Sequence, residues 1–514
     1  MDILTHSETE RPPSMADRRE ITLWGSFTWG YSGVGANVYV ALGLVMASAR
    51  GAAPLAFAAA GVVYLLIGLA HTELASTYPG AGGMYYYPLR GLGDFWGFIA
   101  GAALLLDYTL HIALFCMASA GYFNFFFPSF QNFRISGGPF GNFNLIWMME
   151  TLFLIFFLMF LNIKGARYSS FFSKLMSGVD LIVESVVIVF GFLLIWNPDL
   201  ALSQVISEAP TLKQFFYAVS IAFISYVGLE SISHAAQETR RPATIIPRTS
   251  VGLILVVVLL ALMLPTLSIG VLPWQTIALQ EGAPVTVLAA EIPYIGFLAG
   301  GAVAILGATI ILISANTVVM GASRLTFSMS KFKVAGSWLN QLHPTLKTPI
   351  RSIILLPMIA VVEVLVGFSS GPRPMETMVN LYAFGAILAH LLSLISLVRL
   401  RIHDPYTPRP YKMPFNLRVR SKEIPILAVI TILFTSVLLA LVMWTHPLGR
   451  FVGPVWVLLW ILYYLWYRKR SGFPLIGNLK RDWESEQIAI FASTGELDLL
   501  EEYQSALAER DKVQ

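Results

Sequence analysis

Cysteine and charge are both scarce in this sequence. Cys116 is the only cysteine among 514 residues, which excludes an intramolecular disulfide and any cysteine-based zinc site. Charged residues make up 12% of the chain and hydrophobic residues 56%, a balance far from that of a soluble globular protein. The composition therefore indicates a polytopic membrane protein.

Long apolar runs fill most of the chain. A window of about 19 residues finds twelve candidate spans, at 21–47, 53–77, 92–122, 143–161, 172–196, 212–236, 249–272, 293–324, 350–368, 377–399, 424–445 and 451–468. Continuous runs of this length are typical of membrane helices, since barrel strands are shorter and alternate in polarity. We predict an all-α fold with 12 transmembrane helices.

Basic residues are missing from the central parts of these runs, although acids are present. The acids are Asp107, Asp180, Glu184, Glu230 and Glu363. A carboxylate at the bilayer centre costs about 2.5 to 3.5 kcal/mol, so such residues usually face a cavity and bind protons, metal ions or cationic substrates. The asymmetry points to cation-coupled transport.

The distribution of basic residues predicts the orientation. If the N-terminus is cytoplasmic, all but five of the 34 Lys and Arg fall on the cytoplasmic side. The five exceptions are Arg50, Arg134, Lys213, Arg373 and Arg450. We expect cytoplasmic segments at 1–20 and 469–514 around a transporter domain at 21–468. The basic loops are interpreted as topology signals that touch anionic lipid, not as nucleic-acid sites.

The two terminal segments carry few further signals. The first twenty residues lack the apolar core and small-residue cleavage site of a signal peptide, so none is expected. Near the other end, Ser493 to Glu496 fits a capping box that opens a short acidic helix. This tail is too small to be a catalytic domain.

Polar residues and glycine interrupt two of the spans at about the same depth. The first site contains Ser32, Gly33, Gly35, Ala36 and Asn37, and the second contains Ser225, Tyr226, Val227, Gly228 and Glu230. An interrupted helix exposes free N–H groups on one half and free carbonyls on the other, which suits a zwitterion or a cation. The alternative, that these glycines only allow close helix packing, stays open.

The two interrupted spans are the first and the sixth. Because an odd number of spans separates their starts, two five-span units would have opposite orientations in the membrane. Such inverted repeats, at about 21–196 and 212–399, are expected of secondary transporters that hold substrate near the midplane. The spans within 424–468 would be additions outside the repeat.

Several short motifs resemble those of the amino acid-polyamine-organocation superfamily of permeases, which have the LeuT-type five-plus-five fold. The similarity extends from about residue 21 to 468. Its motifs are Glu73 to Pro79 with Ala81 to Gly83 and Tyr85, Leu106 to Tyr108, Leu161 to Gly165, Gly228 to Glu230 with Glu238 and Pro242, Ala315 to Thr317, Gly321 to Leu325, and Pro408 to Tyr411. Their order and spacing together are specific.

The resemblance implies a substrate site between the two breaks. Backbone amides in a Gly-Ser-Gly pattern bind the substrate carboxylate in the family, and the matching residues here are Gly35, Ala36 and Asn37. Two of the three depart from that pattern. The carbonyls of Ile224 and Val227 match those that hold the substrate ammonium, and Tyr226 would lie beside them as a gate.

The resemblance also implies an ion site. Asp180 aligns with a position where proton-driven relatives can carry lysine, so the charge is reversed here. The ion-coupling group expected around it is Asp180, Glu230, Ser314, Asn316 and Thr317. The ion would be Na⁺ near Asp180 and Thr317, or a proton, and the two stay open. Glu230 would sense protons or cap the second half-helix.

Other polar residues have plainer interpretations. Glu184 and Ser177 lie one turn from Asp180, so the three share a helix face. Asp107, Tyr108 and His111 share a face that would line the substrate cavity. The single histidines His234 and His390 are interpreted as core residues, and Glu363 receives no role.

Catalysis and channel function fit the sequence poorly. The sequence contains no nucleotide-binding loop, no HExxH and no histidine pair at ligand spacing. An acyltransferase using His111 and Asp107 is a distant alternative. A channel would show a repeated filter or pore-lining ring.

We therefore predict a plasma-membrane transporter, not an enzyme, that takes up a small neutral amino acid by alternating access. A proton or Na⁺ gradient would drive it, without a cofactor or a firmly bound metal. Its partners are the lipid bilayer and the substrate, and the sequence does not indicate an oligomeric state. The alternative is a carrier of potassium, an organic cation or a polyamine with the same fold.

Overall fold

The computed structural model describes residues 21–80, 82–135, 143–165, 169–228, 230–236, 239–280, 282–346, 348–371, 373–419, 422–475 and 477–513. The predicted segment 1–20 lies outside these ranges, as do the motif residues Ala81, Leu229 and Glu238. The side chain of His234 is likewise not described.

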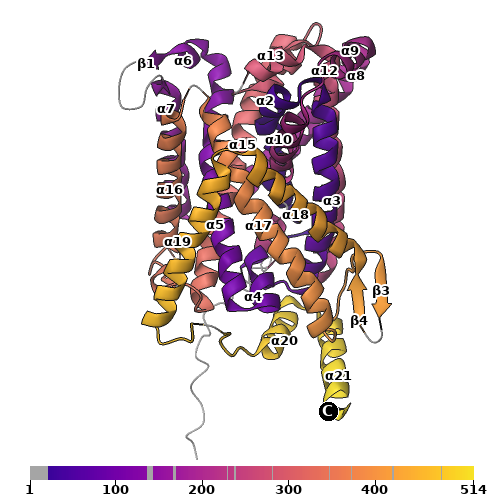
Figure 1. Ribbon diagram of the computed structural model, residues 1–514, viewed down its shortest axis with the longest axis vertical. Coiled ribbons are helices and arrows are strands. Elements are labelled where there is room, and N and C mark those ends of the chain that lie inside the picture. The colour runs from indigo at the N-terminus through magenta and orange to yellow at the C-terminus, as the bar shows by residue number, and fades with distance from the viewer. Residues whose placement is uncertain are drawn as a thin grey trace, which may run out of the picture.

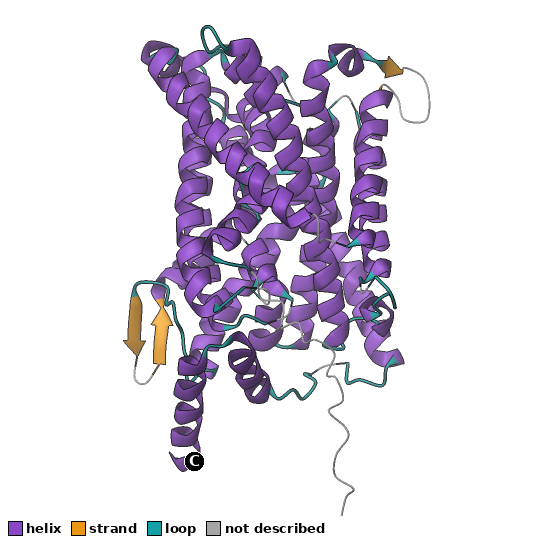
Figure 2. Cartoon of the chain, turned by 180° about the vertical axis from the view of Figure 1, so that it is seen from behind, coloured by secondary structure: helices purple, strands orange, loops and turns teal. Residues whose placement is uncertain are grey.

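Long helices run side by side along the long axis of the molecule (Figure 1, Figure 2). Among the described residues, 11 helical segments are long and apolar enough to cross a membrane. The first of them, Leu23–Thr77, contains the first two predicted spans. The predicted all-α polytopic fold is confirmed, because each predicted span corresponds to a helix or to a pair of half-helices.

The bounds of the helices follow the apolar runs within a few residues. In the first half they are α1 Leu23–Val34, α2 Asn37–Ala49, α3 Ala53–Thr77, α4 Tyr86–Leu92, α5 Asp94–Phe123, α6 Pro128–Asn132, α7 Leu145–Lys164, α8 Ser169–Leu194 and α9 Pro198–Ser207. In the second half they are α10 Leu212–Ala222, α11 Ser231–Ala235, α12 Pro242–Val271, α13 Trp274–Leu279, α14 Pro284–Ala290, α15 Gly296–Lys331, α16 Ile350–Ser369, α17 Pro374–His403, α18 Ile426–Thr445, α19 Gly449–Arg470, α20 Trp483–Thr494 and α21 Leu497–Val513.

Short 3-10 turns and two small hairpins connect these helices. The 3-10 turns are η2 Arg50–Ala52, η3 Gly83–Tyr85, η4 Asn124–Phe126, η6 Phe223–Tyr226 and η7 Ser337–Asn340. Strands β1 Arg134–Ile135 and β2 Phe143–Asn144 pair antiparallel, and so do β3 Asn416–Val419 and β4 Lys422–Pro425. The second hairpin was not predicted, since its polar, charged strands lack the apolar alternation that marks a half-buried strand.

Helix starts carry ordinary capping chemistry. The Thr211 hydroxyl accepts the N–H of Gln214, and the Gln214 side chain returns to the Thr211 N–H, a capping box at the start of α10. Asn144 accepts the N–H of Trp147 at the start of α7. These caps set the points at which spans 4 and 6 enter the apolar layer.

Burial separates central from peripheral helices. In α5 the whole apolar window is buried inside the protein, whereas only 17% of that window is buried in α19 and 28% in α7 and α18. The helix α5 packs on α15 and α17. It therefore lies at the centre of the bundle, and α7, α18 and α19 present apolar faces outward, as lipid contact requires.

The C-terminal segment folds against one end of the bundle, opposite α9 and α13 (Figure 1). Asp94 at the start of α5 forms ion pairs with Arg468 and Arg481. The Gln487 side chain donates to the carbonyl of Thr77 at 3.1 Å and accepts from Arg90 at 2.7 Å. The tail is thereby tied to the ends of α3, α4 and α5.

The predicted capping box at Ser493 to Glu496 is wrong. Helix α20 continues through Thr494 and ends at Gly495, whose φ of +72° is the left-handed conformation common at helix ends. The hydroxyls of Ser493 and Thr494 bond back to their own helix. Glu496 instead accepts the N–H of Ala243 and so caps α12. The acidic helix predicted to follow is present as α21.

Candidate functional site

The sixth span is broken, as predicted. Helix α10 and η6 end at Tyr226, Val227 has an extended backbone with ψ 139°, and Gly228 has φ +127°. The second half-helix, α11, starts at Ser231. A Cβ atom at Gly228 would lie 2.2 Å from the carbonyl oxygen of Gly33. Glycine is required here by its φ and by the close approach of the first span.

The first span is interrupted only slightly. Gly35 and Ala36 separate α1 from α2, yet both keep right-handed helical backbone angles. The N–H of Gly35 donates to the carbonyl of Tyr31 at 2.7 Å. The expectation that this amide is free for a carboxylate is therefore wrong, because the helical hydrogen bond persists across the interruption.

The two breaks meet through Asn37. Its side-chain N–H₂ group donates to the carbonyl of Ile224 at 3.3 Å and to the carbonyl of Val227 in a shorter contact. These are the two carbonyls that the resemblance assigns to the substrate ammonium. Their oxygens thus bind an N–H donor in the interior of the bundle, and that donor comes from the residue that departs from the family pattern.

Several acceptors around the breaks are buried without a partner among the described residues. They are Asn37 Oδ1, Asp107 Oδ1, Ser225 Oγ and Ser231 Oγ. A Cβ at Gly33 would lie 2.9 Å from Ser231 Oγ, so Ser231 faces the first span. A buried polar atom without a hydrogen bond costs about 1 to 3 kcal/mol. A ligand rich in N–H donors would relieve this cost. Ser231 is the residue that the sequence reasoning missed.

Glu230 supports the break itself. One of its carboxylate oxygens accepts the N–H of Gly228 at 3.0 Å, and the residue is only 5% exposed. The bond holds the backbone of Gly228 in its unusual conformation. This geometry favours the structural interpretation of Glu230, although proton sensing stays a prediction.

Two further residues predicted for the substrate site are anchored elsewhere. The Tyr226 hydroxyl donates to the carbonyl of Phe57 in α3 at 2.9 Å, and its ring stacks on Tyr64. The Ser32 hydroxyl donates to the carbonyl of Trp29 in its own helix. Tyr226 therefore joins the sixth span to the second.

A polar chain connects the third span to the first. His111 lies 2.9 Å from the Tyr382 hydroxyl through Nδ1 and 3.1 Å from the Ser314 hydroxyl through Nε2. Ser314 in turn donates to the carbonyl of Gly33 at 3.2 Å. Spans 1, 3, 8 and 10 are thus linked at the break. Tyr382 has no signal in the sequence beyond its place in an apolar run.

The residues expected around the ion are divided between two places. Asp180 accepts hydrogen bonds from the hydroxyls of Tyr31 at 3.0 Å and Tyr39 at 3.2 Å. Asn316 accepts from Asn162 in α7, and Thr317 bonds to the carbonyl of Ile313 in its own helix. The described residues contain no group of three or more His, Cys, Asp or Glu that could hold a metal ion.

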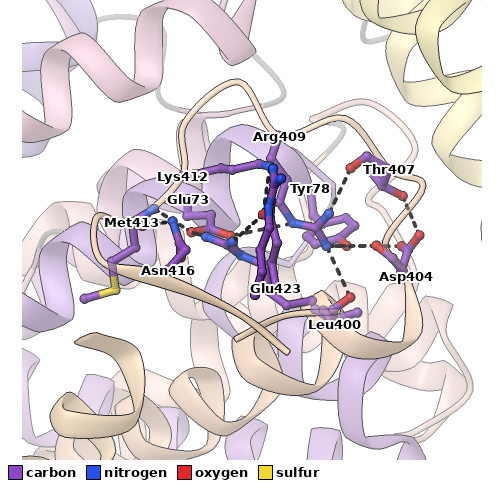
Figure 3. Close-up of polar contacts among 12 residues, drawn as sticks. Glu73, Tyr78, Leu400, Asp404, Thr407, Arg409, Lys412, Met413, Asn416 and Glu423 are labelled. Carbon is purple, nitrogen blue, oxygen red and sulfur yellow. Dashed lines mark hydrogen bonds and ion pairs between the residues drawn. The ribbon is translucent and has the colours of Figure 1, made fainter. Parts of the chain in front are cut away.

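An ion-pair network, here called the Glu73 network, joins α3 to the end of α17 and the segment that follows (Figure 3). Arg401 pairs with both carboxylate oxygens of Glu73, at 2.5 and 2.6 Å, and the N–H of Met413 donates to Glu73 at 2.7 Å. Arg409 lies 3.6 Å from the same carboxylate. Glu73 and Arg409 belong to two motifs more than 300 positions apart in the chain, which therefore form one structure.

The Glu73 network extends along the same surface. Asp404 pairs with Arg90 at 3.0 Å and accepts from the Tyr78 hydroxyl at 3.1 Å. Glu423 pairs with Lys412 at 3.0 Å, and this hydrogen bond lowers the pKa of the Glu423 carboxyl. The cluster closes the end of the bundle on which the C-terminal helices lie.

Known proteins resemble this chain over most of its length. A family profile described as amino acid permease matches residues 21–466. Branched-chain amino acid permease BcaP of Bacillus subtilis is 26% identical over 451 residues, which cover 85% of this chain and 90% of the relative. From the same organism, the Methylthioribose transporter is 23% identical, covering 74% of this chain and 81% of the relative. Serine/threonine exchanger SteT is 24% identical, with 74% and 83% covered.

Proposed function

Because this chain belongs to the amino acid permease family, we propose that it takes up a small neutral amino acid by alternating access, driven by a proton or Na⁺ gradient. The family consists of membrane transporters, and the relatives are named permeases, transporters or exchangers rather than enzymes. The substrate, the coupling ion and the direction of transport are the parts of this statement that we propose.

One observation supports the substrate site above all others. The carbonyls of Ile224 and Val227 accept the N–H₂ group of Asn37. An ammonium group offers three donors and a positive charge, so it makes stronger bonds to the same oxygens than a neutral amide does. Substrate would displace the Asn37 amide and turn it toward the cavity.

The printed names of two relatives favour a neutral side chain. One transports branched-chain amino acids and another exchanges serine and threonine. The unpartnered Asp107 favours the alternative, a carrier of an organic cation, a polyamine or potassium, because a buried carboxylate attracts a positive charge. We assign Asp107 to the amino group of the substrate rather than to its side chain.

Coupling is assigned to the acids of the fifth and sixth spans. Asp180 contacts both halves of the interrupted first span through Tyr31 and Tyr39. Glu230 holds the backbone of the broken sixth span. An ion bound at either carboxylate would alter one of the two hinges that alternating access requires. We place the protein in the plasma membrane with both termini in the cytoplasm.

Transport by purified protein in liposomes tests this proposal. A panel of leucine, serine, threonine, lysine, putrescine and Rb⁺ would be offered while pH and Na⁺ gradients are imposed one at a time. We expect saturable, gradient-driven accumulation of a neutral amino acid. Transport confined to putrescine or Rb⁺ would establish the alternative, and transport of none of the panel would refute the proposal.

A further inference from the structure

Two buried carboxyl groups of α8 meet at a single phenol. The Tyr31 hydroxyl lies 3.0 Å from Asp180 Oδ2 and 3.0 Å from Glu184 Oε2. Asp180 and Glu184 are each 1% exposed and Tyr31 is fully buried. Glu184 was recognised in the sequence only as a residue on the same helix face, and nothing in the sequence connects it to Tyr31.

Proton counting constrains this arrangement. A phenol has one proton, so Tyr31 can donate to only one of the two carboxylates. The second short contact is a hydrogen bond only if the other carboxyl group donates to the phenol oxygen, and for this it must be protonated. Two like charges so close together in a buried site do not both ionise, and they titrate as a pair.

Positive charge near the pair is directed elsewhere. No ion pair among the described residues involves Asp180 or Glu184. The helix α8 packs on α1, α12 and α15. Lys174 of α8 reaches Gly25, Arg248 of α12 is exposed, and Arg324 of α15 lies over the ring of Trp29. The other base of α15, Lys331, is the last residue of that helix.

The remaining titratable neighbours of the pair are phenols. Tyr39 donates to Asp180 Oδ1, and the Tyr122 hydroxyl donates to the carbonyl of Tyr39 at 3.0 Å. Charge at the pair is therefore set by the two carboxyl groups themselves.

Unused hydrogen-bonding capacity remains on the same helix face. Ser177 Oγ and Glu184 Oε1 are buried and have no partner among the described residues. Ser177, Asp180 and Glu184 recur at helical spacing, and all three are buried while most residues between them are partly or fully exposed. The Ser177 hydroxyl is a second proton donor and acceptor one turn from Asp180.

The pair also holds the interrupted first span on both sides. Tyr31 belongs to α1 and Tyr39 to α2, and both donate to Asp180. Gly35 lies between them, and a Cβ at Gly35 would be 2.4 Å from the Tyr31 ring, so this ring packs directly on the interruption. A change of charge on the pair would change the hydrogen bonds that join the two half-helices.

We propose that Asp180 and Glu184 share one proton through the Tyr31 phenol, and that this proton is the coupling ion of transport. The inference rests on the proposed transport function and commits it to the proton rather than to Na⁺. Release of the proton leaves two carboxylates and one donor at Tyr31. The hydrogen bonds that hold α1 to α8 then rearrange together with the hinge at Gly35.

Infrared spectroscopy of the purified full-length protein tests the shared proton without transport. At neutral pH we expect a carboxylic-acid C=O stretch that moves in D₂O. The band should disappear in the double variant Asp180→Asn and Glu184→Gln, and Tyr31→Phe should shift it. The control Glu363→Gln changes a buried acid that accepts from Thr109, and it should leave the Tyr31-dependent part of the band in place. A spectrum unchanged by Tyr31→Phe and by the double variant would overturn the shared proton.

Transport in liposomes with the membrane potential clamped at zero tests the coupling. One coupled proton supports about tenfold accumulation per unit of pH gradient. Wild type and Glu363→Gln should reach this ratio, while Asp180→Asn and Glu184→Gln should only equilibrate the substrate, with exchange and substrate affinity retained. Accumulation driven by Na⁺ alone, or unchanged in both acid variants, would overturn the proton assignment. Loss of substrate binding by wild type itself would instead refute the proposed function and leave the infrared test standing.

Discussion

Gly228 and Asn37 control access to the carbonyls of the sixth span in different ways. Gly228 allows the backbone turn that frees the carbonyl oxygens from helical pairing. Asn37 then occupies these oxygens with its own amide. The first residue creates the acceptors and the second competes for them, so substitutions at the two positions should affect substrate binding in opposite directions.

Replacing Gly228 by alanine should weaken substrate binding by about tenfold or more, since strain at a forced backbone conformation costs about 1 to 3 kcal/mol. The new Cβ would lie 2.2 Å from the carbonyl oxygen of Gly33 and would push the first span away. Equilibrium binding of labelled substrate to purified protein measures the effect. Gly252→Ala is the matched control, because nothing lies within 4 Å of a Cβ there. Wild-type affinity in Gly228→Ala would contradict the site assignment.

Replacing Asn37 by glycine should tighten the binding of an α-amino acid. The substrate would no longer displace two hydrogen bonds of about 1 kcal/mol each, so an affinity gain of about tenfold is expected. The same binding assay measures it, with thermal unfolding as a check on the fold. Weaker binding would show that the Asn37 amide is itself a ligand of the substrate.

At the scale of elements, α3 and α17 are joined by the Glu73 network, and both helices border the broken spans. Glu73 and Arg401 are 0% and 3% exposed, so their charges are compensated mainly by each other and by Arg409 and the Met413 amide. A buried pair of this kind contributes little net stability, yet the loss of one partner is expensive.

Replacing Arg401 by methionine should reduce the free energy of unfolding by about 3 to 5 kcal/mol, because Glu73 keeps a buried charge without its main partner. Adding Glu73→Gln should recover most of the loss. Arg373→Met is the control, since its ion pair with Glu376 at 3.5 Å is exposed and should be worth less than about 1 kcal/mol. Unfolding of the four proteins in one detergent gives the comparison, and equal effects of Arg401→Met and Arg373→Met would contradict the argument.

At the scale of the whole molecule, basic side chains gather at the end that carries the C-terminal helices. Arg90, Arg401, Arg409, Arg468 and Arg481 all take part in ion pairs at that end. Positively charged segments are retained in the cytoplasm. The end with α20 and α21 should therefore face the cytoplasm, and the end with α9 and α13 should face outward.

Cysteine labelling tests this orientation. Cys116 is buried and is the only cysteine, so Cys116→Ala provides a background without reactive thiols. In intact cells an impermeant maleimide should label Asp199→Cys, which lies at an exposed position of α9, but should label Lys480→Cys only after lysis. The reverse pattern would invert the proposed topology.

Much of the architecture follows from one-dimensional patterns. Apolar runs of membrane length force the backbone to satisfy its own hydrogen bonds, so the spans are helices near the predicted bounds. The break of the sixth span follows from Gly228 and its polar neighbours. The same pattern predicted too large an opening in the first span, because the Gly35 amide remains bonded to Tyr31.

Contacts between distant helices could not be inferred in this way. Asn37 meets Ile224 across 187 positions, and Tyr31 meets Asp180 across 149. Helical periodicity tells which residues share a face, but the rotation and crossing of packed helices determine which face each one meets. For this reason Asp180 could be selected as an unusual buried acid from the sequence, while its partners Tyr31, Tyr39 and Glu184 emerged only once the helices were placed together.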